Sequence, residues 1–120
     1  MQAQQTVLVV VSNGGDRLMP GLVLRPFGFT VLECESAQEV QRLLSHKTLA
    51  GVLVDVQLKG GSCMEVLRCI RKHPMHSETL VVACTDHAAP EVRTHWLSQG
   101  FGGVLLKPFR SMDLLALLIL

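Results

Sequence analysis

Five short apolar runs, each followed by a polar or glycine-containing segment, constrain the fold of this chain more than any other sequence feature. Runs of this length, rich in β-branched residues and bounded by turn residues, are typical of buried strands. The stretches between them carry helical patterns, so strands and helices alternate. This alternation predicts an α/β fold, a doubly wound five-stranded parallel sheet with helices on both faces. The predicted strands are residues 6–11, 29–34, 51–55, 80–84 and 103–106.

The helices between these strands have recognisable start signals. Ser36 and Glu39 form a capping box, in which each side chain bonds the other's backbone amide, before a helix that should reach about residue 46. The helix after the first strand should start near residue 16 and be short or kinked. Pro20 and Pro26 fall in that stretch, and an interior proline costs a helix roughly 3 kcal/mol. Further helices are predicted over residues 63–72, 90–99 and 111–120.

Length and composition predict one compact domain. The chain has 120 residues, of which 48% are hydrophobic and 18% charged, which is enough apolar material for a full core. The net charge is +1 and the basic residues are scattered, so we expect no direct nucleic-acid binding. The apolar run at residues 114–120 is far shorter than the roughly 20 residues that span a bilayer, so we expect no membrane contact. The core should comprise residues 7–11, 52–54, 80–83 and 104–106.

Cysteine and histidine residues do not predict a metal site. The four cysteines form no Cys-x-x-Cys pair and no secretory signal precedes them, so reduced thiols in a cytoplasmic protein are expected. His73 with His76, and Cys84 with His87, could each be half of a zinc site. A structural zinc site normally needs four ligands in two tight pairs, and these spacings do not supply them.

Three polar residues stand at the C-terminal ends of the third, fourth and fifth predicted strands: Asp55, Thr85 and Lys107. In a doubly wound sheet these ends meet at one edge, where ligands collect. The set suits a phosphoryl group, with Asp55 as nucleophile, Lys107 neutralising the transferred oxygens and Thr85 bonding one of them. A simpler explanation also exists, in which Asp55 is only the ion-pair partner of Lys107 and Thr85 only caps a turn.

The spacing of these residues resembles that of the receiver domain of bacterial two-component response regulators, over the whole chain. Thr85 follows Asp55 by 30 residues and Lys107 follows it by 52, and Lys107-Pro108-Phe109 matches a family motif. The resemblance implies a flavodoxin-like strand order 2-1-3-4-5 and a cis peptide bond before Pro108. It also implies that Asp55 is the phospho-acceptor, Thr85 the switch hydroxyl and Lys107 the phosphate contact. Such a domain is not an enzyme beyond self-phosphorylation and autodephosphorylation at Asp55.

One departure from the family pattern concerns the metal. In the family, two acids at the end of the first strand hold Mg²⁺ beside the phospho-acceptor. By spacing these positions are Val11 and Ser12 here, or Ser12 and Asn13 if the register slides by one, and neither pair contains a carboxylate. Mg²⁺ prefers several oxygen ligands, and here it would depend on Asp55, the Gln57 backbone carbonyl and water. We therefore expect Mg²⁺ binding to be weak or absent.

Other departures surround the same site. Asp86 follows Thr85 where the family usually has a small residue, and Lys59 replaces a usual proline. Cys63 replaces a usual glycine, and Val104 replaces an aromatic residue or histidine. Two functions follow: a receiver in a two-component phosphorelay with a degenerate metal pocket, or a pseudo-receiver that acts as a protein-interaction module without phosphorylation.

The resemblance also implies partners. A receiver takes its signal from a histidine kinase or phosphotransfer protein and passes it to an effector domain or output protein. Because residues 1–120 form a receiver without an effector, we expect either a domain excised from a longer regulator or a stand-alone relay protein. The apolar end of the chain favours excision. Homodimerisation through the fourth helix, fifth strand and fifth helix is a further expectation, and Trp96 on the fourth helix is a candidate anchor for a partner.

Overall fold

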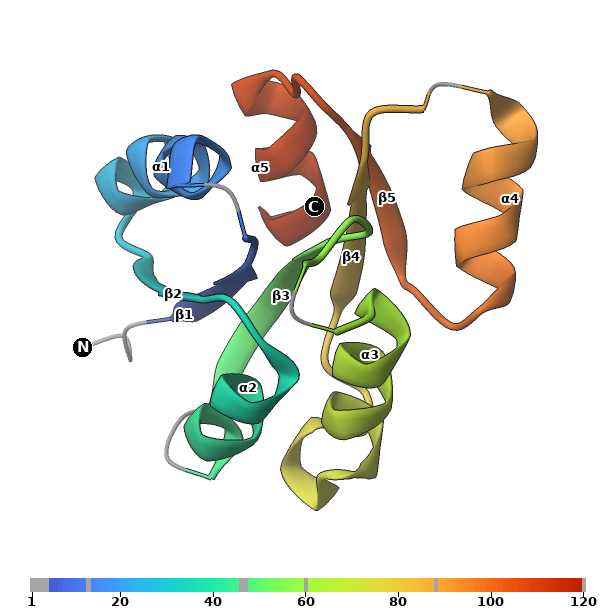
Figure 1. Cartoon of the computed structure of the whole chain (residues 1–120). Coiled ribbons are helices and arrows are strands. Elements are labelled where there is room, and N and C mark those ends of the chain that lie inside the picture. The colour runs from blue at the N-terminus through green and yellow to red at the C-terminus, as the bar shows by residue number, and fades with distance from the viewer. Residues whose placement is uncertain (1–4, 13, 46–47, 60, 88, 120) are drawn as a thin grey trace.

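The computed structural model describes residues 5–12, 14–45, 48–59, 61–87 and 89–119, with the side chains of residues 14–18 left out. The described residues form one parallel five-stranded sheet (Figure 1), and the strand order is 2-1-3-4-5 as predicted. The strands are β1 (Thr6–Val10), β2 (Thr30–Cys34), β3 (Leu49–Asp55), β4 (Val81–Thr85) and β5 (Gly103–Leu106).

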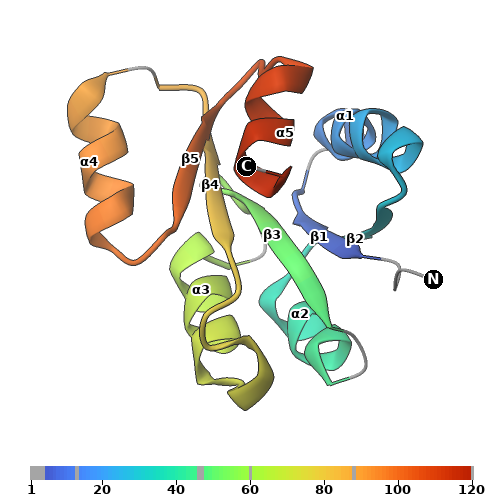
Figure 2. The same cartoon turned by 180° about the vertical axis from the view of Figure 1, so that it is seen from behind.

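Helices cover both faces of this sheet (Figures 1 and 2). The first and last helices lie on one face, and the three between them lie on the other. Short 3-10 helices over residues 25–27 and 74–76 follow the first and third helices. The α-helices are α1 (Gly14–Leu24), α2 (Ala37–Leu44), α3 (Cys63–Lys72), α4 (Pro90–Ser98) and α5 (Ser111–Ile119).

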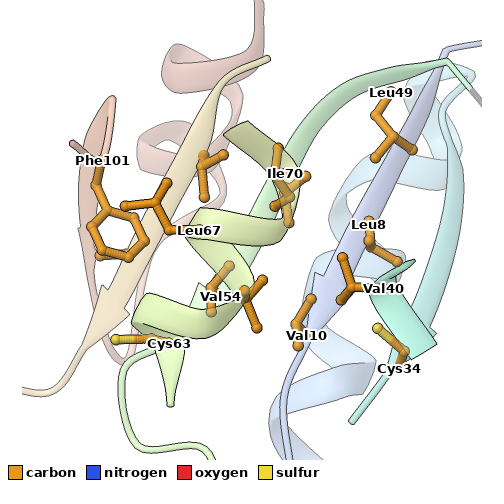
Figure 3. Packing of buried hydrophobic residues seen from close by; sticks show 14 of the residues in the cluster. Leu8, Val10, Cys34, Val40, Leu49, Val54, Cys63, Leu67, Ile70 and Phe101 are labelled. Carbon is orange, nitrogen blue, oxygen red and sulfur yellow. The ribbon is translucent and has the colours of Figure 1, made fainter. Parts of the chain in front are cut away.

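The alternation of side chains along β1 divides the core into two layers. Successive residues of a strand point to opposite faces of the sheet, so Leu8 and Val10 pack under α2 and α3 (Figure 3). Val7 and Val9 pack on the other face, beneath α1 and α5. All four are at most 1% exposed. The continuous apolar run in the sequence therefore reflects a strand that is buried on both faces, as in other parallel sheets.

The predicted core is wrong at one edge of the sheet. Leu80 and Val104 are only partly buried, and Leu106 is 44% exposed. Val104 and Leu106 belong to β5, an edge strand paired with β4 on one side only, whereas Leu80 lies just before the first residue of β4. Of residues 104–106, only Leu105 belongs to the fully buried set.

The first helix also differs from the prediction, because it is not interrupted at Pro20. α1 runs over 11 residues with Pro20 inside it, and the chain turns into a 3-10 helix only around Pro26. Pro20, Val23 and Leu24 are buried against the sheet. Packing of an apolar helix face commonly outweighs the propensity of one residue, and here it outweighs the lost backbone hydrogen bond.

The predicted helix cap at Ser36 is present, and Ser62 forms a second cap that was not predicted. The Ser36 hydroxyl accepts a hydrogen bond from the Glu39 backbone amide at 3.3 Å, and Ser62 does the same for Glu65 at 3.1 Å. α3 and β5 have the predicted bounds. Among the described residues, no helix combines the length and the apolar character needed to cross a membrane.

The fully buried His76 connects the segment after α3 to the end of α2, which is distant in sequence. Its Nε2 lies 3.2 Å from the carbonyl oxygen of Leu44 at the end of α2, and its Nδ1 lies 3.2 Å from the Thr79 hydroxyl. The His76→Phe change keeps a ring there but removes the hydrogen bonds to the buried Leu44 carbonyl and to the partly buried Thr79 hydroxyl. We expect it to lower the free energy of unfolding by about 1–3 kcal/mol, measured by urea denaturation. His87→Phe, on a side chain that is 68% exposed, is the matched control, and an equal loss in the two variants would contradict the prediction.

Candidate functional site

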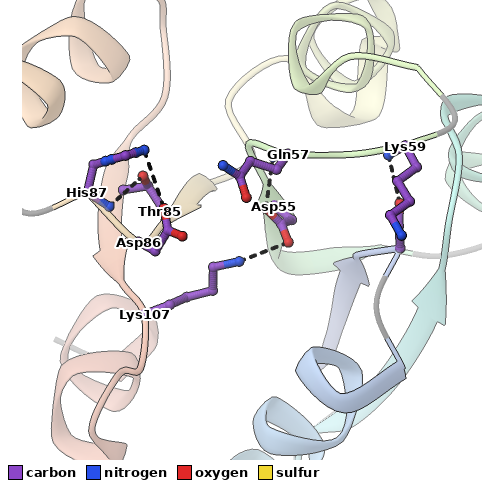
Figure 4. A network of polar contacts seen from close by, with 8 residues as sticks. Asp55, Gln57, Lys59, Thr85, Asp86, His87 and Lys107 are labelled. Atoms are coloured by element: carbon purple, nitrogen blue, oxygen red, sulfur yellow. Dashed lines mark hydrogen bonds and ion pairs between the residues drawn. The ribbon is translucent and has the colours of Figure 1, made fainter.

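The predicted site residues lie at one edge of the sheet because their strands run parallel. Asp55 is the last residue of β3, Thr85 is the last residue of β4, and Lys107 directly follows β5. The register places Asp55 opposite Cys84. The Lys107 backbone amide donates a hydrogen bond to the Thr85 carbonyl oxygen at 2.7 Å. The three C-terminal ends are thus fixed relative to one another by the sheet itself (Figure 4).

Asp55 and Lys107 form a mostly buried ion pair. The Lys107 ammonium nitrogen lies 3.0 Å from Asp55 Oδ2, and the two side chains are 18% and 7% exposed respectively. The other carboxylate oxygen, Oδ1, accepts a hydrogen bond from the Gln57 backbone amide at 2.8 Å (Figure 4). Both oxygens of the carboxylate are therefore engaged. The expected convergence of these residues is observed, and the peptide bond before Pro108 is cis, as predicted.

Thr85 is placed at the same edge but is engaged in a turn. Its hydroxyl accepts a hydrogen bond from the His87 backbone amide at 3.2 Å, and the residue is 1% exposed. Thr85 also lines a surface hollow together with Val56 and Trp96, the latter half-buried on α4. This geometry matches the simpler explanation for Thr85, a turn hydroxyl, while its switch role stays a prediction.

The residues described at this edge do not fit a magnesium ion. Val11 is 4% exposed and apolar, and Ser12 offers a neutral hydroxyl. Gln57 contacts Asp55 through its backbone amide, not through the carbonyl that would bind a metal. Over the described side chains, which exclude that of Asp16, no three His, Cys, Asp or Glu residues form a metal-binding cluster. One carboxylate, already paired with Lys107, is a poor set for a hard dication.

A hydrogen bond joins Ser12, at one of the positions where the family has an acid, to the loop that follows β3. The Ser12 hydroxyl accepts a hydrogen bond at 2.9 Å from the backbone amide of Lys59, 47 residues away (Figure 4). Two departures from the family pattern meet in this bond, since proline at position 59 would have no N–H to donate. Sequence inspection noted both positions separately but missed the contact between them.

Asp86 carries a carboxylate that is exposed to solvent. Its carboxylate lies 3.5 Å from Nε2 of His87, and the side chains of Asp86 and His87 are 53% and 68% exposed. This pair is charged on both sides only when His87 is protonated. The acid after Thr85 is therefore a surface group in this structure (Figure 4).

Cys63 opens α3 beside the site and is 3% exposed. Burial is the largest cause and raises the pKa of its thiol, backbone hydrogen bonds at Cys63 and Met64 lower it by less, and the negative charge of Asp55 makes the smallest contribution, which raises it. A thiol is nucleophilic only as thiolate. Cys63 is thus an inert packing residue at neutral pH rather than a reactive group of the site.

Comparison with known proteins identifies the class of domain. The family model for the response regulator receiver domain matches residues 17–119. The chain therefore belongs to the response regulator receiver domain family of two-component signalling. Receiver domains interact with histidine kinases and effector domains, bind Mg²⁺ in their active sites and are not enzymes in the usual sense. The resemblance drawn from Asp55, Thr85 and Lys107 is thereby confirmed at the level of the family.

Individual proteins are similar to this chain in sequence or in fold. The chain is 28% identical over 110 residues to the phosphate regulon transcriptional regulatory protein PhoB of Klebsiella pneumoniae, covering 92% of this chain and 48% of PhoB. It thus spans about half the length of this curated relative. A solved structure of a response regulator from Chloroflexus aurantiacus superposes with a TM-score of 0.85 at 23% identity, covering 95% of this chain and 93% of the other. The receiver domain of the sensor histidine kinase PA1611 from Pseudomonas aeruginosa holds a magnesium ion in its active-site cleft. It superposes with a TM-score of 0.84 at 24% sequence identity, covering 97% of this chain and 95% of the other.

Proposed function

We propose that Asp55 is the phospho-acceptor of this receiver and that phosphorylation there depends only weakly on Mg²⁺. The ion pair between Asp55 and Lys107, at 3.0 Å, is the observation that supports this most directly. In this pair a carboxylate and a positive charge lie next to each other at the edge of the sheet, which supports the proposed role. The family match favours this function over a phosphorylation-independent interaction module.

The reaction follows from the groups at the site. A carboxylate oxygen of Asp55 attacks the phosphorus of a phosphohistidine on the kinase or phosphotransfer protein. The O–P bond forms as the P–N bond breaks, and the histidine nitrogen keeps the electron pair. Lys107 offsets the negative charge on the transferred oxygens, and the Thr85 hydroxyl turns from the His87 amide to donate to one of them. Autodephosphorylation is the attack of water on the same phosphorus, and we propose no other reaction for the domain.

The absence of a fitting metal set implies a slow reaction. Two anions, the carboxylate and the phosphoryl donor, must approach each other, and here Lys107 supplies the positive charge that reduces their repulsion. We propose that Mg²⁺ binds weakly or not at all, through Asp55 and the Gln57 carbonyl if it does.

The proposed partners follow the family. We propose a histidine kinase or phosphotransfer protein as donor, an effector domain or output protein as receiver of the signal, and a cytoplasmic location without nucleic-acid contact by this domain. The chain would be one part of a longer regulator, as the coverage of PhoB suggests. A homodimer through α4, β5 and α5 is supported by exposed apolar side chains on those elements: Leu97, Leu106, Met112 and Ile119.

A direct phosphorylation assay tests the proposal. The chain is incubated with phosphoramidate in EDTA or in Mg²⁺, and intact mass and Trp96 fluorescence are followed. We expect one added phosphoryl group and a fluorescence change, because Thr85 and Trp96 line one hollow. The rates in EDTA and in Mg²⁺ should differ by less than about tenfold, far below what a well-formed metal site supplies.

Asp55→Asn is the control, because it keeps the shape of the side chain without the nucleophile. The variant should gain no mass. Equal modification of the variant and the native chain would refute Asp55 as the acceptor, and no modification of the native chain under any condition would refute the proposed reaction.

A further inference from the structure

A cavity of about 160 Å³ lies next to the Asp55–Lys107 pair, on the face of the sheet that α1 and α5 cover. Its floor consists of Val9, Leu53 and Cys84, which come from the adjacent strands β1, β3 and β4. These three residues are at most 4% exposed. The floor is therefore part of the packed core, fixed by the strand register and not by a loop.

The walls of the cavity come from three segments that meet above this floor. Met19 and Pro20 of α1 form one side, Val11 at the end of β1 forms a second, and Pro108 and Phe109 after β5 form a third. Met19 is 43% exposed and Pro108 is exposed. The cavity is thus bounded by apolar side chains and reaches the surface between α1 and the segment after β5.

The size and lining of the cavity indicate what it can hold. Apolar cavities of about 150 Å³ in protein interiors remain dry and take up benzene. The cavity here, at about 160 Å³, has room for a group of that size. Val11 is important for this apolar character, because it lines the cavity at the same edge of the sheet as Asp55 and Lys107.

A lysine among the lining residues adds a second requirement. Of the described residues that line it, Lys107 alone carries a charge, and its ammonium nitrogen ends 3.0 Å from Asp55 Oδ2. We propose that the cavity binds a small aromatic carboxylate about the size of benzoate. Its ring fills the apolar space, and its carboxylate contacts the Lys107 ammonium in competition with Asp55.

This binding would act as an input separate from phosphorylation. Because Asp55 and the ligand carboxylate would compete for one ammonium group, an occupied cavity weakens the ion pair that holds Asp55. The ligand therefore changes the charge around Asp55 without reacting with it. The inference requires no phosphoryl donor, so its test is independent of whether Asp55 is ever phosphorylated.

The test uses benzoate itself, titrated into the isotope-labelled full chain and followed by NMR. We expect saturable amide shifts with a dissociation constant on the order of 1 mM, as suits so small a ligand. Intermolecular NOEs should connect the ring protons to the methyl groups of Val9 and Leu53. Benzamide, which has the same shape without the charge, should bind at least about threefold more weakly. In Lys107→Met, benzoate should bind no better than benzamide.

Val11→Phe and Val56→Phe form a matched pair of variants. Val11 lines the cavity, whereas Val56 lines the hollow beside Trp96 on the other side of the site. Filling the cavity should weaken benzoate binding at least about tenfold, and the second variant should leave it unchanged. Equal weakening by both variants, NOEs to other residues, equal binding of benzamide, or no saturable shift would each overturn the inference. If Val11→Phe does not fold, the NOEs and the benzamide comparison on the native chain decide.

Discussion

Replacing Lys107 by methionine is expected to lower the free energy of unfolding at neutral pH by about 3 kcal/mol. Removing one partner of a buried ion pair leaves the other charge without compensation, and such changes cost about 3–5 kcal/mol when the pair is fully buried. Asp55 is 7% exposed and Lys107 18% exposed, so the lower end of that range applies. Urea denaturation followed by circular dichroism measures the loss.

A double-mutant cycle separates the ion pair from other effects of the substitution. Asp55→Asn in the Lys107→Met background removes the uncompensated charge, so the double variant should be more stable than Lys107→Met alone. Lys72→Met, on an exposed residue of the last turn of α3, should change the stability by less than about 0.5 kcal/mol. Strictly additive losses in the cycle would mean that Asp55 and Lys107 do not interact in solution.

Restoring acids at the end of β1 should create a magnesium site. In the double variant Val11→Asp with Ser12→Asp, two carboxylates join Asp55 at the edge of the sheet, which is the oxygen-rich set that Mg²⁺ prefers. We expect its affinity for Mg²⁺ to rise at least about tenfold over the native chain. Isothermal titration calorimetry measures this change. Because Val11 is 4% exposed, the variant should also be less stable than the native chain without Mg²⁺ and recover stability as Mg²⁺ is added.

Two comparisons make the result decisive. Adding Asp55→Asn to the double variant should return the affinity for Mg²⁺ to nearly the native level, because the site then loses its central ligand. Ca²⁺, which accepts larger and less regular sites, serves as a second probe of the same carboxylates. If the double variant binds Mg²⁺ no better than the native chain, the missing acids are not the reason for weak binding.

The sequence predicted the fold well where local pattern and tertiary structure agree. The β1 run, the cap at Ser36 and the bounds of α3 and β5 each follow from residues within a few positions. α1 was mispredicted because Pro20 is unfavourable locally but is buried in the core of the folded protein. The exposure of Leu106 depends on β5 being the edge strand, which the residues of β5 do not encode by themselves.

The site was predictable to a similar extent. Strand ends can be located from sequence, and a parallel sheet then brings Asp55 and Lys107 together. The hydrogen bond that engages Thr85 in a turn depends on the path of the following loop. The cavity beside Lys107 depends on side chains from α1, three strands and the segment after β5. Neither the hydrogen bond of Thr85 nor the cavity can be predicted from the spacing of residues along the sequence.

The Ser12–Lys59 hydrogen bond connects the segments after β1 and β3 without any charged group or metal ion. Metal ligation between two loops weakens when divalent ions are chelated and when carboxylates are protonated. A hydroxyl and a backbone amide, 2.9 Å apart, have no charge to titrate in the physiological range and require no ion. The loops after β1 and β3 should therefore keep their relative position across changes in acidity and cation supply. In this domain the two loops would be held by the chain alone, whatever ions the cell provides.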